Sequence, residues 1–248
     1  MKKALTLTLV FLFILFTSTS LRKEAINTKI SSIDVLDKCI KHYDPNGTWD
    51  SFSGKVRIKT IFPEWNNEEY LEINNGTGFY QSTILSTEEK IIRGIKDGKC
   101  IRMIGDNSDL TEGQIEDNNL SCESIKMARE HHTCHFGFVM NLKKAGIKIN
   151  EDVSEDIFNG CDCYVVSFDG FKEDVISDYY LGTSKLFIDK SNFVLRGIVR
   201  IHPDYPERKR IITGELKIND IIMPNVVTYY LGDNEQPNFV DIFYNVED

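Results

Sequence analysis

The chain has 248 residues, of which 41% are apolar and 27% charged, and this balance excludes both bulk disorder and a polytopic membrane protein. The net charge of −9 argues against nucleic acid as a partner, because an acidic surface repels phosphate backbones. The length suits one large domain or two small ones.

The N-terminus has the layout of a secretory signal peptide over residues 1–20. Two lysines precede an apolar run over residues 4–16, and small residues then allow cleavage after Ser20. The run is too short to span a bilayer comfortably, so we expect no integral membrane protein after cleavage. The first cysteine is Cys39, so a lipobox is absent. We therefore expect an unlipidated protein in the periplasm or outside the cell.

The mature chain is predicted to begin with an amphipathic helix over residues 31–43. Ile33, Leu36 and Ile40 share one apolar stripe of this helix, with Cys39 beside them. The turn at residues 44–47 (DPNG) ends it, because proline cannot continue a helix and Asn-Gly favours a turn.

A strand-rich region follows the first helix. Residues 55–62 alternate apolar and basic side chains, which places Val56, Ile58 and Thr60 on one side of a half-buried antiparallel strand. Further strands are expected at residues 70–73, 78–85, 90–95 and 99–104. The pair at residues 97–98 (DG) predicts a hairpin turn between the last two strands.

The middle of the chain changes to a helical period over residues 120–142. Ser121 and Glu123 mark the start of this helix, and Gly137 is expected to end or break it. One stripe of the helix contains Ile125, Ala128, His132, His135, Phe136 and Val139.

The C-terminal half again predicts strands, at residues 161–168, 175–181, 185–189, 193–202, 208–218, 226–231 and 238–244. Since no repeat or linker interrupts the pattern, residues 21–248 are predicted to form a single α+β domain. About twelve strands indicate a large curved antiparallel sheet that forms an unclosed β-barrel. One or two helices are expected to cover its concave face.

Export would place the six cysteines in an oxidising compartment. Cys100 and Cys122 are the preferred disulfide pair, because each lies at the edge of a predicted element. Cys161 and Cys163 point to the same face of a predicted strand, where a bond between them is awkward. They are either free or bonded elsewhere, and no second CxC or CxxC pair accompanies them as a zinc site would require.

Several longer motifs together resemble a known group of proteins. They are residues 42–49 (HYDPNGTW), 52–54 (FSG), 120–123 (LSCE), 214–224 (GELKINDIIMP) and 229–230 (YY). Over residues 31–244 the chain resembles secreted bacterial proteins related to outer-membrane lipoprotein-sorting proteins, the LolA/LppX-like half-barrel group, and within it a family of unknown function. The resemblance implies an unclosed barrel around an apolar cavity, with helices as a lid. Such a cavity shields acyl chains from water, at about 0.8 kcal/mol per CH₂.

The sharpest cluster of chemically reactive side chains is residues 130–135 (EHHTCH). His131 and His135 lie four apart on a helix, so their imidazoles could share a metal ion. A zincin would need Glu where this chain has His132, and a third ligand would have to come from Cys134, Glu130 or His42. Because His132 and His135 lie on the apolar stripe, we favour packing over metal binding or catalysis.

The candidates for lining an apolar cavity are Trp49, His132, His135 and Phe136. Trp49 could instead staple the first helix to the sheet. Cys134 lies near the histidines, but no oxyanion-hole motif accompanies it. No glycine-rich phosphate loop is present, so we expect no cofactor.

Three functions follow from these observations, in order of preference. The first is an exported carrier with an apolar cavity for a lipid or a lipidated protein. The second is a secreted structural or interaction module whose own side chains fill the cavity. The third is a metal-dependent enzyme using His131 and His135. These observations leave enzymatic activity open and favour a protein without it.

Overall fold

A computed structural model describes residues 30–85, 88–144, 147–169 and 182–246 of the chain. The predicted signal peptide at residues 1–20 and the predicted strand at residues 175–181 lie outside these ranges. Within the described ranges, no helix combines the length and the apolar character needed to cross a membrane.

The described residues are dominated by β-strands. The strands are β1 (Ser53–Ile61), β2 (Asn66–Asn74), β3 (Phe79–Ile84), β4 (Ile91–Lys96), β5 (Lys99–Ile104), β6 (Lys148–Ile149), β7 (Ser154–Phe158), β8 (Cys161–Asp169), β9 (Thr183–Asp189), β10 (Leu195–His202), β11 (Tyr205–Ile218), β12 (Ile221–Leu231) and β13 (Phe239–Asn245).

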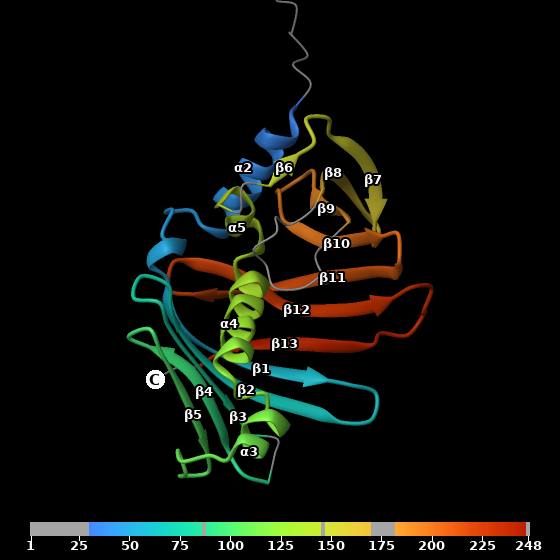
Figure 1. Ribbon diagram of the computed structural model, residues 1–248. Helices are drawn as coiled ribbons and strands as arrows, with labels where there is room; N and C mark the ends of the chain where they lie inside the picture. Colours follow the sequence, from blue (N-terminus) through green and yellow to red (C-terminus); the bar gives the residue numbers. More distant parts are fainter. Residues whose placement is uncertain (1–29, 86–87, 145–146, 170–181, 247–248) are drawn as a thin grey trace, which may run out of the picture. The chain divides into compact units, whose positions relative to one another are not determined.

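These strands form a 13-stranded antiparallel sheet in the order β5-β4-β3-β2-β1-β13-β12-β11-β10-β9-β8-β6, with β7 also paired to β8 (Figure 1). The order is an open path, so the sheet is not closed into a barrel, which confirms the predicted fold class.

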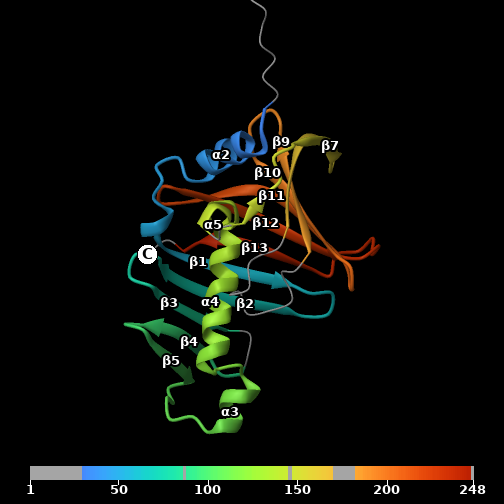
Figure 2. The ribbon, with the colours of Figure 1, turned by 45° about the horizontal axis from the view of Figure 1, so that its top comes forward.

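The helices are α2 (Ser32–Tyr43), α3 (Glu112–Asp117), α4 (Cys122–Phe136) and α5 (Phe138–Lys144), with a 3₁₀ turn at Trp49–Ser51. In both ribbon views α4 crosses one face of the sheet and α5 continues from its end (Figures 1 and 2). We call this the helix-covered face. The predicted cover of one sheet face by helices is therefore present.

Strand alternation places the expected side chains on the helix-covered face. Val56 and Ile58 of β1 are buried as predicted, and Thr60 on the same face donates a hydrogen bond from Oγ1 to Asp241 Oδ1 at 2.7 Å. The hairpin between β4 and β5 turns at Asp97 and Gly98, whose φ angles are 50° and 72°. Positive φ at both positions is the geometry that Asp-Gly favours.

The predicted stripe of the first helix is wrong in part. Ile33 is 45% exposed, and the buried side is formed by Ser32, Val35, Leu36, Cys39 and Tyr43. Both stripes contain Leu36, so helical spacing alone allowed either. Tyr43 decides between them, because its hydroxyl accepts a hydrogen bond from the backbone N–H of Leu195 in β10.

The predicted break at Gly137 is confirmed, since α4 ends there and α5 begins one residue later. A Cβ atom at Gly137 would overlap the indole of Trp49. Trp49 is buried, and its Nε1 donates a hydrogen bond to Asn141 Oδ1 of α5 at 2.9 Å. Close packing against Trp49 therefore explains the glycine at this junction.

Three short elements were not predicted. Helix α3 follows a capping box in which Thr111 and Gln114 bond each other's backbone N–H groups, a signal present in the sequence. Strand β6 has only two residues, and β7 is an almost fully exposed partner of β8, so neither shows the alternation of a half-buried strand.

Strand β12 begins earlier than predicted and includes Pro224. Pro224 pairs with Glu215 of β11, whereas the ladder to β13 begins only at Val226. A proline has no N–H to donate, and it is tolerated here because one side of the strand is still unpaired at this position.

The structure supports the predicted disulfide between Cys100 of β5 and Cys122 at the start of α4, with their Cα atoms 5.7 Å apart. Cys161 and Cys163 are free, and both pack with Phe158 and Phe187 in a small core cluster.

Candidate ligand-binding site

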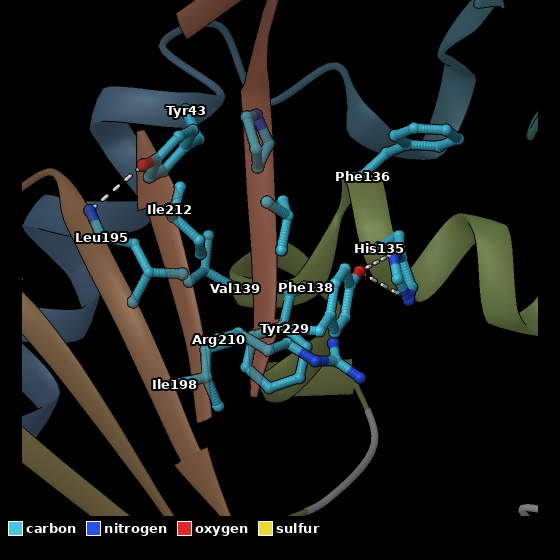
Figure 3. A pocket seen from close by; sticks show the side chains of 12 residues that line it. Tyr43, His135, Phe136, Phe138, Val139, Leu195, Ile198, Arg210, Ile212 and Tyr229 are labelled. Atoms are coloured by element: carbon cyan, nitrogen blue, oxygen red, sulfur yellow. Dashed lines mark hydrogen bonds between the residues drawn. The ribbon is translucent and has the colours of Figure 1, made fainter. Parts of the chain in front are cut away.

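The helix-covered face holds an apolar pocket bounded by strands β10 to β12 and by helices α2, α4 and α5 (Figure 3). The helices contribute Phe136, Phe138 and Val139, and the strands contribute Leu195, Ile198, Ile212, Pro224 and Val227. The remaining cavity is only ≈ 20 Å³, about enough for one water molecule. Since ligand pockets usually measure about 300–1,000 Å³, the protein's own side chains fill most of this space.

Two of the cavity residues predicted from the sequence line this pocket, and two do not. His135 and Phe136 lie in its wall at the end of α4. Trp49 packs instead against Phe52 and the Gly137 junction, as a staple between the 3₁₀ turn and α5. His132 points toward strands β2 and β3, away from the pocket.

Three polar side chains gather at one end of the pocket, from three different elements. The Tyr229 hydroxyl of β12 lies 2.8 Å from His135 Nδ1, and the Arg210 guanidinium of β11 lies 5.2 Å from the centroid of the Tyr229 ring (Figure 3). Loss of solvent and the charges around His135, including that of Arg210, hold the pKa of this histidine well below its ordinary value. His135 is therefore neutral at physiological pH.

The Tyr229 hydroxyl also bonds the carboxyl group of Asp241. Burial raises the pKa of Asp241, against the opposing hydrogen bonds from Thr60 and Tyr229. A hydrogen-bonded chain thus runs from Thr60 through Asp241 and Tyr229 to His135. It fixes the orientation of the imidazole at the pocket wall.

The predicted metal pair lies close together, but the described residues add no third ligand. The rings of His131 and His135 are 4.1 Å apart, centroid to centroid. His42 contacts Glu215 instead, with Nε2 2.5 Å from Oε1. In the part of the chain that the structure describes, no group of three or more His, Cys, Asp or Glu side chains is placed to hold a metal ion.

Cys134 has the opposite environment to that of an activated nucleophile. Burial raises the pKa of its thiol, and the nearby Arg200 only partly opposes this. A nucleophilic cysteine needs a lowered pKa, so this environment does not favour the reactive thiolate of Cys134.

A second polar cluster contacts α4 through His132, on the side of strands β2 and β3. Glu69 of β2 is 6% exposed and accepts a hydrogen bond from the Ser82 hydroxyl. Arg93 Nη2 lies 3.3 Å from its Oε1, and His132 Nε2 lies 3.5 Å from its Oε2. The Tyr80 hydroxyl lies 2.9 Å from His132 Nδ1 and completes the group. We call these five residues the Glu69 network.

The Glu69 network compensates its own charges. Burial would raise the pKa of Glu69, but His132, Arg93 and Ser82 together outweigh it and lower the pKa to about 2. Sequence reasoning missed this cluster. The sequence did contain a sign of this cluster in the alternation of β2. Glu69 shares a face with Leu71 and Ile73, so its carboxylate occupies an inward position.

Comparisons with known proteins establish the fold. No family model and no curated protein matches the sequence. Among solved structures, a LolA superfamily protein from Nitrosomonas europaea superposes with a TM-score of 0.50 at 13% identity, over 89% of this chain and 95% of that chain. A DUF1329 family protein from Desulfovibrio piger gives a TM-score of 0.44 at 10% identity, over 86% and 91% of the two chains. The chain therefore has a LolA-like fold, as the sequence motifs implied.

Proposed function

We propose that the protein is an exported carrier that binds a lipid, or the acyl chain of a lipidated partner, between the helices and the sheet. The observation that carries this proposal is the apolar pocket enclosed by β10 to β12, α4 and α5. The LolA-like fold and the signal-peptide pattern at residues 1–20 agree with it.

Ligand entry requires helix movement, because the cavity has a volume of only ≈ 20 Å³. The segment best suited to move is α5 with the last turn of α4, which contributes Phe136, Phe138 and Val139 to the pocket. An incoming acyl chain would replace these apolar contacts with its own, at about 0.8 kcal/mol per buried CH₂. Such an exchange has a small net free energy, which suits a carrier that must also release its ligand.

Native mass spectrometry of the mature protein, residues 21–248, purified from periplasm without detergent, tests the proposal. An adduct of several hundred daltons that extracts into organic solvent is the expected result. Lipid class would then follow from the extracted mass.

A matched pair of variants shows whether the adduct occupies this pocket. Val227→Phe fills the pocket at a cost of about 1–3 kcal/mol in stability and should abolish the adduct. Ile157→Phe adds similar bulk at a side chain that is 70% exposed on β7 and should leave it unchanged. A clean mass for the wild type, together with no uptake of added lipid, would contradict the carrier.

The small cavity also favours a second candidate, a structural or interaction module whose pocket is permanently filled by its own side chains. This alternative predicts the clean mass and no uptake. It also predicts that Val227→Phe only lowers stability.

A further inference from the structure

The polar residues of the pocket lie at one end, and their placement follows from strand register. Arg210 and Tyr229 are direct partners in the ladder between β11 and β12, and Ile212 and Val227 are the next inward pair along the same strands. The pocket therefore runs parallel to these strands, from a polar end at Arg210 to an apolar interior (Figure 3). At the far end, the Tyr43 hydroxyl is already bonded to the Leu195 backbone.

The polar end carries an excess of positive charge. Within the described ranges, the half-buried Arg210 lies over the Tyr229 ring and forms no ion pair with a carboxylate. Arg200 adds a second guanidinium, 5.7 Å from the ring centroid of Phe138, which also lines the pocket. Arg210 acts on the Asp241 carboxyl group through its charge, but the hydrogen bonds of this carboxyl group are made with Thr60 and Tyr229.

The two nearby imidazoles do not neutralise this charge, and they do not add to it. Loss of solvent and the positive charges around them lower the pKa values of both His131 and His135. In their neutral form these rings can donate or accept a hydrogen bond at the polar end.

We propose that the ligand is an amphiphile with an anionic headgroup, a carboxylate or a phosphate, which Arg210 binds while the acyl chain extends past Ile212 and Val227. This inference rests on the proposed carrier function and names its ligand class. A guanidinium matches the geometry of either anion with two parallel hydrogen bonds, and partial burial strengthens both. Arg200 and the imidazole of His135 lie where they would support the same headgroup.

The test uses three probes with the same chain and different headgroups: dodecanoate, dodecyl phosphate and dodecanol. Their affinities for the mature protein are measured by calorimetry below the concentration at which micelles form. We expect the better of the two anions to bind about tenfold or more tightly than the neutral alcohol, since a hydrogen-bonded charge contributes about that factor. The stronger anion identifies the headgroup as carboxylate or phosphate.

Arg210→Gln should reduce the affinity for that anion about tenfold and leave the affinity for dodecanol unchanged. Lys209→Gln is the matched control, because Lys209 is the next residue of β11, points to the opposite face of the sheet and lies over Tyr230. It removes the same charge and should change neither affinity. Arg210→Lys keeps the charge without the planar fork and should retain part of the anion preference.

The outcomes separate the two proposals. Equal affinity of the wild type for all three probes would overturn the headgroup inference and leave the carrier intact. An equal loss of anion and alcohol binding in Arg210→Gln would also overturn it, by assigning Arg210 a purely structural part. No binding of any probe would contradict the carrier itself and, with it, the headgroup.

Discussion

Two of the three histidines of helix α4, His132 and His135, have surroundings that differ in charge. His132 faces the Glu69 network, where a buried carboxylate is balanced by Arg93 and by the imidazole itself. His135 faces Arg210 and Tyr229, where positive charge gathers beside an apolar pocket. A cluster whose charges are paired with each other stabilises the fold. A cluster with unbalanced charge is suited to bind a ligand of opposite charge.

The same contrast distinguishes the last turn of α4 from the rest of the helix. Up to His132, α4 is joined to the sheet by the Cys100–Cys122 disulfide and by the Glu69 network. The last turn of α4 and α5 are held by apolar packing and by the His135–Tyr229 hydrogen bond. We therefore expect the helix up to His132 to stay fixed while its last turn and α5 move to admit a ligand.

Glu69→Gln should have the largest effect on stability, a loss of about 3–5 kcal/mol in the free energy of unfolding, because the buried Arg93 guanidinium would lose its countercharge. Urea unfolding measures it. The control is Glu68→Gln, whose partner Arg57 is more exposed, with a cost of at most about 1 kcal/mol. Equal losses of stability in the two variants would show that burial of the Glu69 network does not increase its contribution to the free energy of unfolding.

Acid should remove the contribution of Glu69. Its pKa is about 2 in the folded protein against an ordinary value of 4.5, so its stabilisation is complete above pH 4.5 and is lost as the pH falls toward 2. The groups that face this carboxylate are Ser82, Arg93 and His132, and the shift corresponds to about 3 kcal/mol. Unfolding curves at pH 7, 5 and 3 should show the wild type approaching Glu69→Gln. A difference that stays constant with pH would contradict this assignment.

Replacing both cysteines of the disulfide with serine should cost about 3 kcal/mol, because the bond closes a loop with a sequence separation of 22. Thermal unfolding measures the loss, and Cys134→Ser, at a free half-buried thiol, is the control with a smaller effect. Non-reducing peptide mapping should recover Cys100 and Cys122 together. Recovery of both cysteines as alkylated free thiols would contradict the disulfide that joins α4 to β5.

Gly137→Ala should destabilise the protein by about 1–3 kcal/mol, because the added methyl group overlaps the Trp49 indole at the junction of α4 and α5. Gly113→Ala is the matched control, since it lies in α3 with open space around its Cβ position and should be neutral or slightly stabilising. If Gly137→Ala were as harmless as Gly113→Ala, Trp49 would not constrain the junction. Both free energies come from the same urea titration.

The strands and the helix break could be predicted because their causes are local. Alternation identified β1 through Val56 and Ile58, and helical spacing placed His135 and Phe136 on one apolar stripe. Strand β7 was not predicted, because an exposed edge strand needs no alternation of apolar and polar side chains.

The two polar clusters could not be predicted as clusters, because strand register and helix packing bring their members together. Tyr229 and His135 are 94 residues apart in sequence, and Tyr80 and His132 are 52 apart. The sequence could only show single polar residues at inward positions, such as Glu69 between apolar neighbours of the same face.

Arg210→Gln should have the smallest effect on stability, a change within about 1 kcal/mol, because no carboxylate of the described residues forms an ion pair with Arg210 and its removal leaves no buried countercharge. Lys209→Gln, on the opposite face of the same strand, is the control in the same urea titration. A loss comparable to that of Glu69→Gln would mean that Arg210 is as structural as the Glu69 network. The two polar clusters that contact α4 would then differ in composition but not in role.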